Sequence, residues 1–504
     1  MRRLEECLTG VGIRWFLLKN KYRYLKDIKI FHSSWLVMWA SLGIVIGAYS
    51  SQFTVEFIGV EWVVVSACLL IVSFINKKYL AIGLALAAGT LFGLYRGGNQ
   101  VASEQAYEQY IGAEVSVVGR VAEDPSYDVD GDLRMKLINV EVEGEPVKGE
   151  LWLATSGGVA IKRSDVVTAN GRLSEGFGIL PAALYRARVQ SIERQDYTDV
   201  ARDTRDWFAG KIRDGVREPE ASLGSGFLLG QKTALPEKLD QELRLLGLTH
   251  IVVASGYNLS ILVRYGRRLL ERVSRFTALA GSGFLVFAFA NVTGFSPSMS
   301  RASLITGLSL VAWYFGRKFH PLVLLSFSAG LTVAINPVYA WGDIGWLLSF
   351  TSFIGVIMLS PLIHAYFWGD KKSGVLRQVT IETMSAQLLT LPLIVYVFGQ
   401  YSVLALPANI LILPLIPVAM LLTFIAGIGA VLLPFAAQQI AWPSETLLGY
   451  MTAVVDRLAQ QPQAVSEIEI NVSYLVVGYL FLTALIVYLW RRTGHKFRDY
   501  NIIE

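Results

Sequence analysis

Several polar side chains lie within stretches of this sequence that are apolar enough to enter a membrane. Residues 236–263, PEKLDQELRLLGLTHIVVASGYNLSILV, carry His250, Ser255 and Asn258 in their apolar second half. Polar groups in hydrocarbon are costly, so they are usually retained for helix packing or for function. The chemistry to be expected of these three side chains is therefore hydrogen bonding inside a membrane.

Two charged residues also stand in apolar surroundings and are expected, with His250, near the outer ends of their helices. Arg301 should pair with Asp343, which would avoid leaving a lone charge in hydrocarbon, whereas Glu382 should be too distant. One interpretation of this pair is a clamp between helices. The other is an entrance contact to phosphate groups, for which the planar guanidinium group is suited.

Three neutral amides, Asn258, Gln387 and Asn409, are expected at mid-depth in the membrane. Hydrogen bonding between helices is one interpretation of these side chains. The other is a water-filled path, in which amides offer weak and repeated contacts of the kind that suits conduction.

Small and aromatic residues accompany these amides. Ser255 and Gly256 form a small-residue notch, which either lets helices approach closely or opens a lumen. Trp346, Phe350 and Phe353 recur at helical spacing and give one aromatic face. Such a face is more typical of core or lipid packing than of a ladder on which bases stack.

Membrane helices must position these side chains. The chain has 504 residues, of which 53% are hydrophobic and 17% charged, and its mean hydropathy is +0.46. This composition predicts a polytopic α-helical membrane protein. Apolar runs suited to a hydrocarbon core roughly 30 Å thick occur at residues 35–49, 57–75, 79–95, 251–263, 276–292, 302–315, 321–335, 344–367, 379–398, 403–435 and 472–490.

The run at residues 403–435 is long enough for two short crossings. We expect a tight hairpin broken near Pro414 and Pro417, because proline interrupts helical hydrogen bonding. A re-entrant pair is the alternative. With the hairpin, the chain has about 12 membrane crossings.

Basic residues set the expected orientation. Many Lys and Arg residues precede the first apolar run, which places the N-terminus in the cytoplasm by the positive-inside rule. Basic residues at 77–78, 264–275, 317–318 and 371–377 alternate as this orientation requires. The basic tail at 491–498 then places the C-terminus in the cytoplasm as well, and the polar insert after the third run lies outside.

The polar insert has the composition of a soluble domain. Candidate strands at residues 114–121, 133–142, 149–154, 165–173 and 184–192 predict a small all-β barrel of the OB type, with a β-sandwich fragment as the competing fold. Acidic residues outnumber basic ones between residues 98 and 220, so broad electrostatic capture of nucleic acid is not supported. The candidates for a local basic face that contacts DNA are Arg120, Arg172, Arg186, Arg188 and Arg194.

These features divide the chain into consecutive parts. A basic cytoplasmic N-terminus (1–33) precedes three transmembrane helices (34–97), the extracytoplasmic OB-like domain (98–200), a charged connector (201–235) and an interfacial amphipathic helix (236–248). A transmembrane channel-type domain (249–490) and a cytoplasmic tail (491–504) follow. Cys7 and Cys68 are expected to be free thiols.

One stretch of the sequence resembles a known family. Residues 247–262, GLTHIVVASGYNLSIL, are similar to the hallmark of the ComEC competence channels, in which Gly-Leu-Ser/Thr-His leads into Ser-Gly-Leu-His-Ile. Tyr257 and Asn258 stand where that family has Leu-His. Further similar motifs follow in the family's order, namely GFSPSMSRASL at 294–304, NPVYAWGDIGWLLSF at 336–350 and SAQLLTLPLIVYVFGQYSVLALPANILILPL at 385–415.

The resemblance implies an inner-membrane channel that carries single-stranded DNA into the cytoplasm during natural transformation. Many relatives also end in a metallo-β-lactamase-like domain with a His-x-His-x-Asp-His cluster, whereas the five histidines of this chain are scattered. We therefore expect no nuclease in this chain, and expect a separate nuclease, a DNA receptor and a cytoplasmic motor protein as partners.

We expect neither enzymatic activity nor a cofactor or metal, and no Gly-x4-Gly-Lys-Ser/Thr phosphate loop occurs in the sequence. Two other functional classes stay open. One is a secondary transporter or exporter of a small or lipid-linked substrate, which broken helices and polar residues at mid-membrane would suit. The other is a membrane scaffold whose external domain binds a partner.

Overall fold

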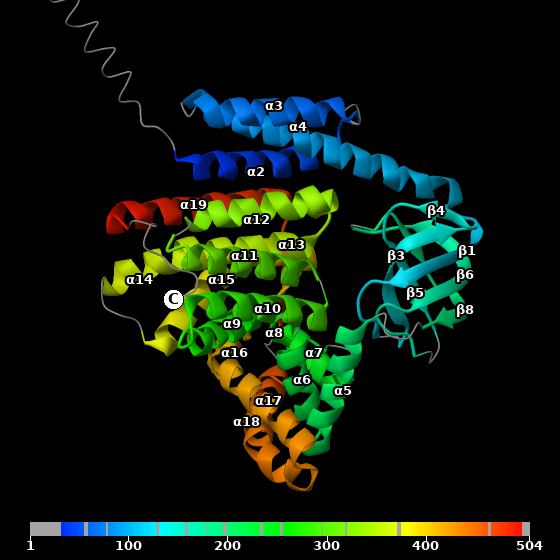
Figure 1. Cartoon of the computed structure of the whole chain (residues 1–504), viewed down its shortest axis with the longest axis vertical. Coiled ribbons are helices and arrows are strands. Elements are labelled where there is room, and N and C mark those ends of the chain that lie inside the picture. Colours follow the sequence, from blue (N-terminus) through cyan, green and yellow to red (C-terminus); the bar gives the residue numbers. More distant parts are fainter. Residues whose placement is uncertain are drawn as a thin grey trace, which may run out of the picture.

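The computed structural model describes residues 32–54, 59–76, 79–127, 131–156, 160–178, 180–194, 199–231, 235–252, 256–294, 296–317, 320–369, 374–461 and 465–495. Ser255 and Cys7 lie outside these ranges. The described helices stack in layers, and a β-domain lies beside the stack, on the right in Figure 1.

The first layer contains three helices, α2 (Ser33–Ser50), α3 (Glu61–Asn76) and α4 (Tyr79–Glu104). α2 and α4 cross closely because their contact is made of glycines: a Cβ on Gly47 would lie 2.0 Å from the Thr90 carbonyl oxygen, and a Cβ on Gly89 would lie 1.9 Å from that of Ala40. Small residues at such crossings let helix backbones approach in a membrane. α4 extends beyond residue 97, the predicted end of the third crossing, and leads through the 3-10 helix η1 (Gln105–Tyr110) into the β-domain.

The main stack lies beneath this layer in Figure 1. It consists of α9 (Gly256–Leu270), α10 (Arg275–Thr293), α11 (Pro297–Tyr314), α12 (Pro321–Ile335), α13 (Ile344–Ile354), α14 (Ser360–Trp368), α15 (Val375–Phe398) and α19 (Val472–Thr493). The 3-10 helix η2 (Pro337–Ala340) joins α12 to α13. A π-helical turn, η3 (Gly355–Leu359), joins α13 to α14.

A second group of helices tapers away from the main stack at the bottom of Figure 1. It contains α5 (Val200–Gly215), α6 (Glu220–Leu229), α7 (Glu237–Leu245), α8 (Thr249–Val252), α16 (Ala405–Ile412), α17 (Ile416–Leu432) and α18 (Ala437–Ala459). The amphipathic helix predicted after Pro236 is confirmed as α7. Its Leu239 and Leu243 are nevertheless buried in an apolar core shared with α6, α17 and α18, so protein rather than lipid covers this face.

The hairpin predicted within residues 403–435 is wrong. α16, the 3-10 turn η4 (Leu413–Leu415) and α17 form one apolar run, Ala405–Leu432, that counts as a single candidate span. Pro414 and Pro417 each fall at the start of a helical segment, where a missing backbone N–H costs little. The chain returns along α18 instead, whose polar residues hid it from the hydropathy pattern.

The two ends of this excursion lie side by side. β9 (Gln400–Ser402) precedes α16, β10 (Val465–Glu467) follows α18, and the two strands pair antiparallel. The chain therefore comes back to the end of the bundle from which it left, by a different path from the one predicted.

Seven helices of the described part are long and apolar enough to cross a membrane. The number is up to 8 if α7 and residues 249–270, which meet at 119°, form one bent span. Two shorter apolar helices, Glu61–Ile75 and Pro321–Ile335, accompany them. The chain is thus a polytopic helical membrane protein, and the count of about 12 crossings stays a prediction.

The β-domain closes into a barrel. The strands β1 (Glu114–Val121), β3 (Leu133–Val142), β5 (Leu151–Thr155), β7 (Ala182–Leu184) and β6 (Val166–Glu175) pair in this order, and β6 pairs back with β1. The β5–β7 pair is parallel, whereas the other pairs of the ring are antiparallel. Two short strands, β2 (Ser126–Tyr127) and β4 (Glu145–Val147), extend β3. The predicted closed barrel is confirmed, and the β-sandwich does not form.

The strand predicted at residues 184–192 is present as β8 but was given too early a start. β7 ends at Leu184, and Arg186 then adopts φ 51°, a left-handed turn that the alternating pattern of the sequence does not reveal. The next strand, β8 (Arg188–Glu193), pairs with β6 outside the closed ring.

Candidate functional site

A cleft of about 630 Å³ lies where the barrel meets the membrane helices. The β3–β4 hairpin and Gly149–Glu150 form its barrel side, while Gln100 of α4 and the end of α12 form the other side. Asn336 ends α12, and its side chain accepts a hydrogen bond from the Val338 backbone N–H, which starts η2. The local sequence Asn-Pro thus turns the chain at the floor of the cleft.

Charged groups of the barrel reach toward this floor. Lys136 of β3 pairs with Glu150 at 3.2 Å and with Glu123 at 3.6 Å. Burial opposes the charge of Lys136, but Glu123 and Glu150 outweigh it and raise the pKa of Lys136 above its ordinary value. Burial, together with the nearby carboxylates of Glu150 and Asp343, also raises the pKa of Tyr339 in η2. Tyr339 therefore lies between the charges of the barrel and those of the helices.

Arg301 lies in the second turn of α11 and is 2% exposed. Its Nη2 donates hydrogen bonds to the Ser298 hydroxyl at 3.0 Å and to the Gly345 carbonyl oxygen at 3.2 Å. The guanidinium carbon is 5.4 Å from the centre of the Phe350 ring, a cation–π distance. Nε and Nη1 have no hydrogen-bond partner among the described residues.

The predicted direct pair between Arg301 and Asp343 is wrong. Asp343 caps α13 by accepting the Trp346 N–H at 2.7 Å, and no ion pair joins it to Arg301 within the described ranges. Asp343 acts on the Arg301 charge only through space. The carboxylate is used for the helix N-terminus, where a negative group is stabilised. Glu382 accepts a hydrogen bond from Gln378 on its own helix.

The residues around Asn258 are closely packed. Asn258 is 0% exposed, and its side-chain nitrogen donates to the Phe227 carbonyl oxygen at 3.0 Å. Gly256 lets α9 approach α11, because a Cβ at this position would lie 2.9 Å from that of Ala302. Tyr257 is 37% exposed. His250 is exposed and donates from Nδ1 to the Gly247 carbonyl oxygen at 2.8 Å.

The other two amides lie on α15 and α16. Asn409 is 1% exposed and donates to the Ala405 carbonyl oxygen of its own helix at 2.7 Å, while its Oδ1 has no partner among the described residues. Gln387 is half-buried on α15. Asn258 and Asn409 are thus closed off from solvent, as polar groups within a packed bundle.

The aromatic face on α13 is turned into the protein. Trp346 and Phe350 are buried against α2 and α12, with ring centres 4.4 Å apart, and Phe353 packs partly against the same cluster. The indole N–H of Trp346 donates to the Thr332 hydroxyl at 3.0 Å. In this arrangement the three rings pack helices together.

Three of the barrel arginines share one outward face. In the strand register, Arg172 lies opposite Glu114 and Arg120 lies opposite Val166. Arg188 lies opposite Asn170. The three arginines therefore project from the same side of β1, β6 and β8. All three are exposed. Arg186 is also exposed but lies in the turn before β8.

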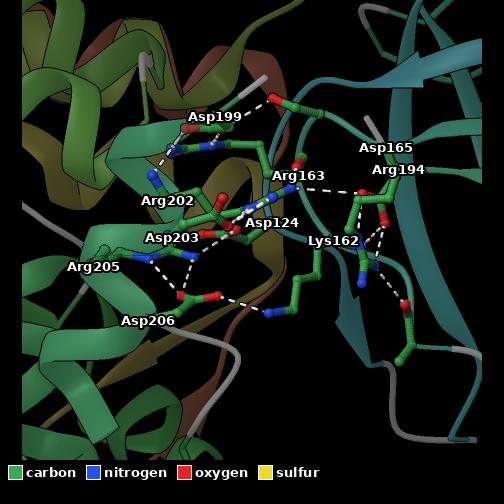
Figure 2. Close-up of polar contacts among 12 residues, drawn as sticks. Asp124, Lys162, Arg163, Asp165, Arg194, Asp199, Arg202, Asp203, Arg205 and Asp206 are labelled. Carbon is green, nitrogen blue, oxygen red and sulfur yellow. Dashed lines mark hydrogen bonds and ion pairs between the residues drawn. The ribbon is translucent and has the colours of Figure 1, made fainter. Parts of the chain in front are cut away.

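The barrel joins α5 through ten charged side chains, called the junction cluster below (Figure 2). Its members are five cations and five carboxylates: Lys162, Arg163, Arg194, Arg202, Arg205, Asp124, Asp165, Asp199, Asp203 and Asp206. Because the numbers match, the cluster has no net charge with which to attract a charged ligand. It is a structural connection between two parts of the chain.

Two arginines of α5 are buried in this cluster. Arg205 donates two hydrogen bonds to Asp124 of the barrel and two to Asp206. Arg202 pairs with Asp203 at 2.7 Å, and its Nη1 lies 3.5 Å from Asp165. Arg202 and Arg205 are only 2% and 3% exposed.

Asp165 is the most enclosed carboxylate of the cluster, with a side chain that is 0% exposed. It accepts hydrogen bonds from Arg194 at 2.6 and 2.9 Å and from the Lys162 N–H at 2.8 Å. Burial alone would raise its pKa, but these hydrogen bonds and the charges of Arg194 and Arg202 lower the pKa of Asp165 below its ordinary value. Arg194, predicted as a candidate for the DNA face, is used here instead.

Sequence reasoning took α5 as a charged structural connector and missed that its charges are buried. The available signal was spacing. Arg202, Arg205, Ala209 and Ile212 recur at i, i+3, i+7 and i+10, and all four are buried on one face.

The membrane part of the chain is similar to known proteins. Residues 227–493 match the family model described as Competence protein. ComE operon protein 3 of Bacillus subtilis (strain 168) is 29% identical over 189 residues, which is 36% of this chain and 23% of that protein. Competence protein ComA of Neisseria gonorrhoeae is 26% identical over 348 residues, covering 66% of this chain and 43% of that protein.

An uncharacterized protein of Aquifex aeolicus (strain VF5) is 23% identical over 190 residues, covering 37% of this chain and 45% of that protein. The chain thus matches less than half the length of each of these relatives. No solved structure matches the chain. The family match spans more than half of the sequence and includes α9 to α19, and on this ground the chain belongs to the competence protein family.

Proposed function

We propose that this protein is an inner-membrane channel that carries single-stranded DNA into the cytoplasm during natural transformation. The observation that carries the proposal is the meeting of two motifs at Arg301. GFSPSMSRASL contributes Arg301 itself, and NPVYAWGDIGWLLSF contributes its contacts Gly345 and Phe350. The second motif also contributes Asn336 and Val338 to the lining of the cleft. Both motifs lie within the segment that matches the competence family.

Arg301 is proposed as a contact to the phosphates of the passing strand. A guanidinium group has five N–H donors, and its planar shape suits two-pronged binding to phosphate. Only Nη2 is hydrogen-bonded among the described residues, and its partners, a hydroxyl and a carbonyl, are neutral. The charge and two nitrogens therefore stay available once the site opens.

The proposal includes an orientation. The barrel lies on the outer side of the membrane and both termini lie in the cytoplasm, because the basic segments of the sequence alternate in that way. The outward face with Arg120, Arg172 and Arg188 is proposed as a first contact for DNA. A nuclease, a DNA receptor and a motor are proposed as separate proteins.

Import of labelled DNA by a deletion strain tests the proposal. The strain should take no labelled strand into the cytoplasm, and the wild-type gene should restore import. Asn258→Leu should reduce import while the protein remains in the membrane. Leucine cannot donate the buried hydrogen bond that Asn258 makes to the Phe227 carbonyl oxygen. Normal import by the deletion strain would contradict the proposal.

A further inference from the structure

Arg163, in the barrel loop before β6, is 6% exposed and contacts the membrane helices. Its Nε and Nη2 hold Asp199 at 2.7 and 2.9 Å. Its Nη2 also donates to the Asn291 carbonyl oxygen at 3.1 Å, and its Nη1 lies 3.5 Å from the Val292 carbonyl oxygen. One side chain of the barrel therefore reaches both α5 and the C-terminal end of α10.

This contact is stabilised on both sides. The last carbonyls of a helix lack partners within the helix, and a positive charge near them is favourable, so Arg163 satisfies the end of α10. Asp199 accepts two nitrogens of Arg163, the Ser164 hydroxyl at 2.9 Å and the Arg202 N–H at 2.9 Å, which caps α5. Burial alone would raise its pKa, but the Arg163 hydrogen bonds lower the pKa of Asp199.

Gly294, which follows α10, fits this contact. It has φ +84°, which other residues adopt only with strain, and a Cβ there would lie 3.0 Å from the Arg163 Nη1. Gly294 is also the first residue of the GFSPSMSRASL motif. The structure thus gives this glycine a role, which is to leave room for an arginine of the barrel.

The same motif leads directly to Arg301. α11 begins after Gly294, with Ser296 as its N-cap and Pro297 in its first turn, and Arg301 follows in the second turn. In the structure Arg163 holds the last carbonyls of α10, and Arg301 is closed off from solvent. Arg301 of α11 meets α13 at the Gly345 carbonyl oxygen and the Phe350 ring.

We propose that Arg163 is a positioning residue: it latches the barrel to the C-terminal end of α10 and so keeps the Arg301 site closed. Release of Arg163 from the carbonyls of Asn291 and Val292 frees the start of α11 and opens the site. The role of the opened site rests on the proposed function, whereas the latch itself is a property of the protein without DNA.

The test measures how fast a membrane-impermeant thiol reagent labels Ser298→Cys, next to Arg301, in full-length protein. Cys7 and Cys68 are replaced by serine so that no other thiol reacts. Arg163→Met should raise the labelling rate at least about tenfold, the factor that corresponds to about 1.4 kcal/mol. Arg163→Lys keeps the positive charge at the end of α10 and should stay closer to the wild-type rate.

Arg194→Met is the matched control. Arg194 also pairs with a buried carboxylate of the junction cluster, but its bonds go to Asp165 and to the Ala160 carbonyl oxygen, within the barrel. Its loss should leave the labelling rate at the wild-type value. Equal rates in the wild type, Arg163→Met and Arg194→Met would overturn the latch.

Gly294→Ala covers the case in which Arg163→Met does not fold. Its Cβ presses on the Arg163 Nη1 at 3.0 Å and strains the backbone at φ +84°, which should weaken the contact without changing any charge and raise the labelling rate. A wild-type rate in folded Gly294→Ala would overturn the latch. The labelling uses no DNA, so its result is independent of the import experiment that tests the proposed function.

Discussion

Buried arginines are paired with carboxylates in the junction cluster but not at the Arg301 site. At the junction, Arg163, Arg202 and Arg205 each hold at least one carboxylate. Arg301 is equally buried, but it has only a hydroxyl and a carbonyl as hydrogen-bond acceptors among the described residues. A fully paired cluster resists change, because removing either partner leaves a buried charge without compensation.

The two regions are suited to different tasks. Charges that are matched one for one fix the barrel on α5 and α10. An arginine whose charge is only distantly opposed by Asp343 has donors left for an anion. The comparison therefore separates a connection that holds the molecule together from a site suited to bind phosphate.

Replacing Asp165 by asparagine should cause the largest loss of stability. Asp165 is fully enclosed and accepts hydrogen bonds from Arg194 and from the Lys162 N–H, so Asp165→Asn removes buried acceptors and leaves Arg202 with Asp203 alone, at a cost of about 1–3 kcal/mol. The unfolding temperature of the purified protein measures this loss. The rate of proteolysis between the barrel and α5 is a second measure of it. Glu175→Gln, at an exposed acid of β6, is the control and should leave the unfolding temperature unchanged.

Acid should cause the second-largest loss of stability, by weakening the junction cluster. The pKa values of Asp165 and Asp199 are lowered in the folded protein, so their contribution to stability is complete above the unfolded value of about 3.9. It is lost as the pH falls through the folded values, when the carboxylates gain protons. Proteolysis at the junction should stay slow from pH 7 down to about 4 and then accelerate. Acceleration near neutral pH would contradict the assignment.

Lys162→Met should have the smallest effect. Lys162 pairs with Asp206 at 3.2 Å, but its side chain is 44% exposed, and exposed pairs contribute roughly 0–1 kcal/mol. The unfolding temperature should fall far less than in Asp165→Asn. Similar losses in the two variants would show that the cluster acts through its total charge rather than through its buried members.

The sequence predicted the parts of the fold that depend on local pattern. Hydropathy located most helices, and alternation gave the bounds of β1 and β3 as the structure has them. It failed where one residue redirects the chain, as Arg186 does before β8. It also failed where proline is tolerated at the start of a helical segment, as at Pro414 and Pro417.

The candidate site was predicted only in part. Arg301 was identified because a charge in an apolar run stands out, but its partners depend on how α11 meets α13, and Asp343 turned out to cap a helix instead. Arg163 was missed because it lies in an ordinary loop of the barrel. Its contact with the carbonyls of Asn291 and Val292 joins residues far apart in the sequence, which no local pattern records.

The most direct test of the contrast between the two regions is DNA import by Arg301 variants, measured beside the thermal stability of the same proteins. Arg301→Lys keeps the charge, and Arg301→Met keeps only the apolar stem. If Arg301 contacts phosphates, Arg301→Met should abolish import, Arg301→Lys should retain part of it, and both proteins should unfold near the wild-type temperature. Normal import by a stable Arg301→Met protein would contradict the account.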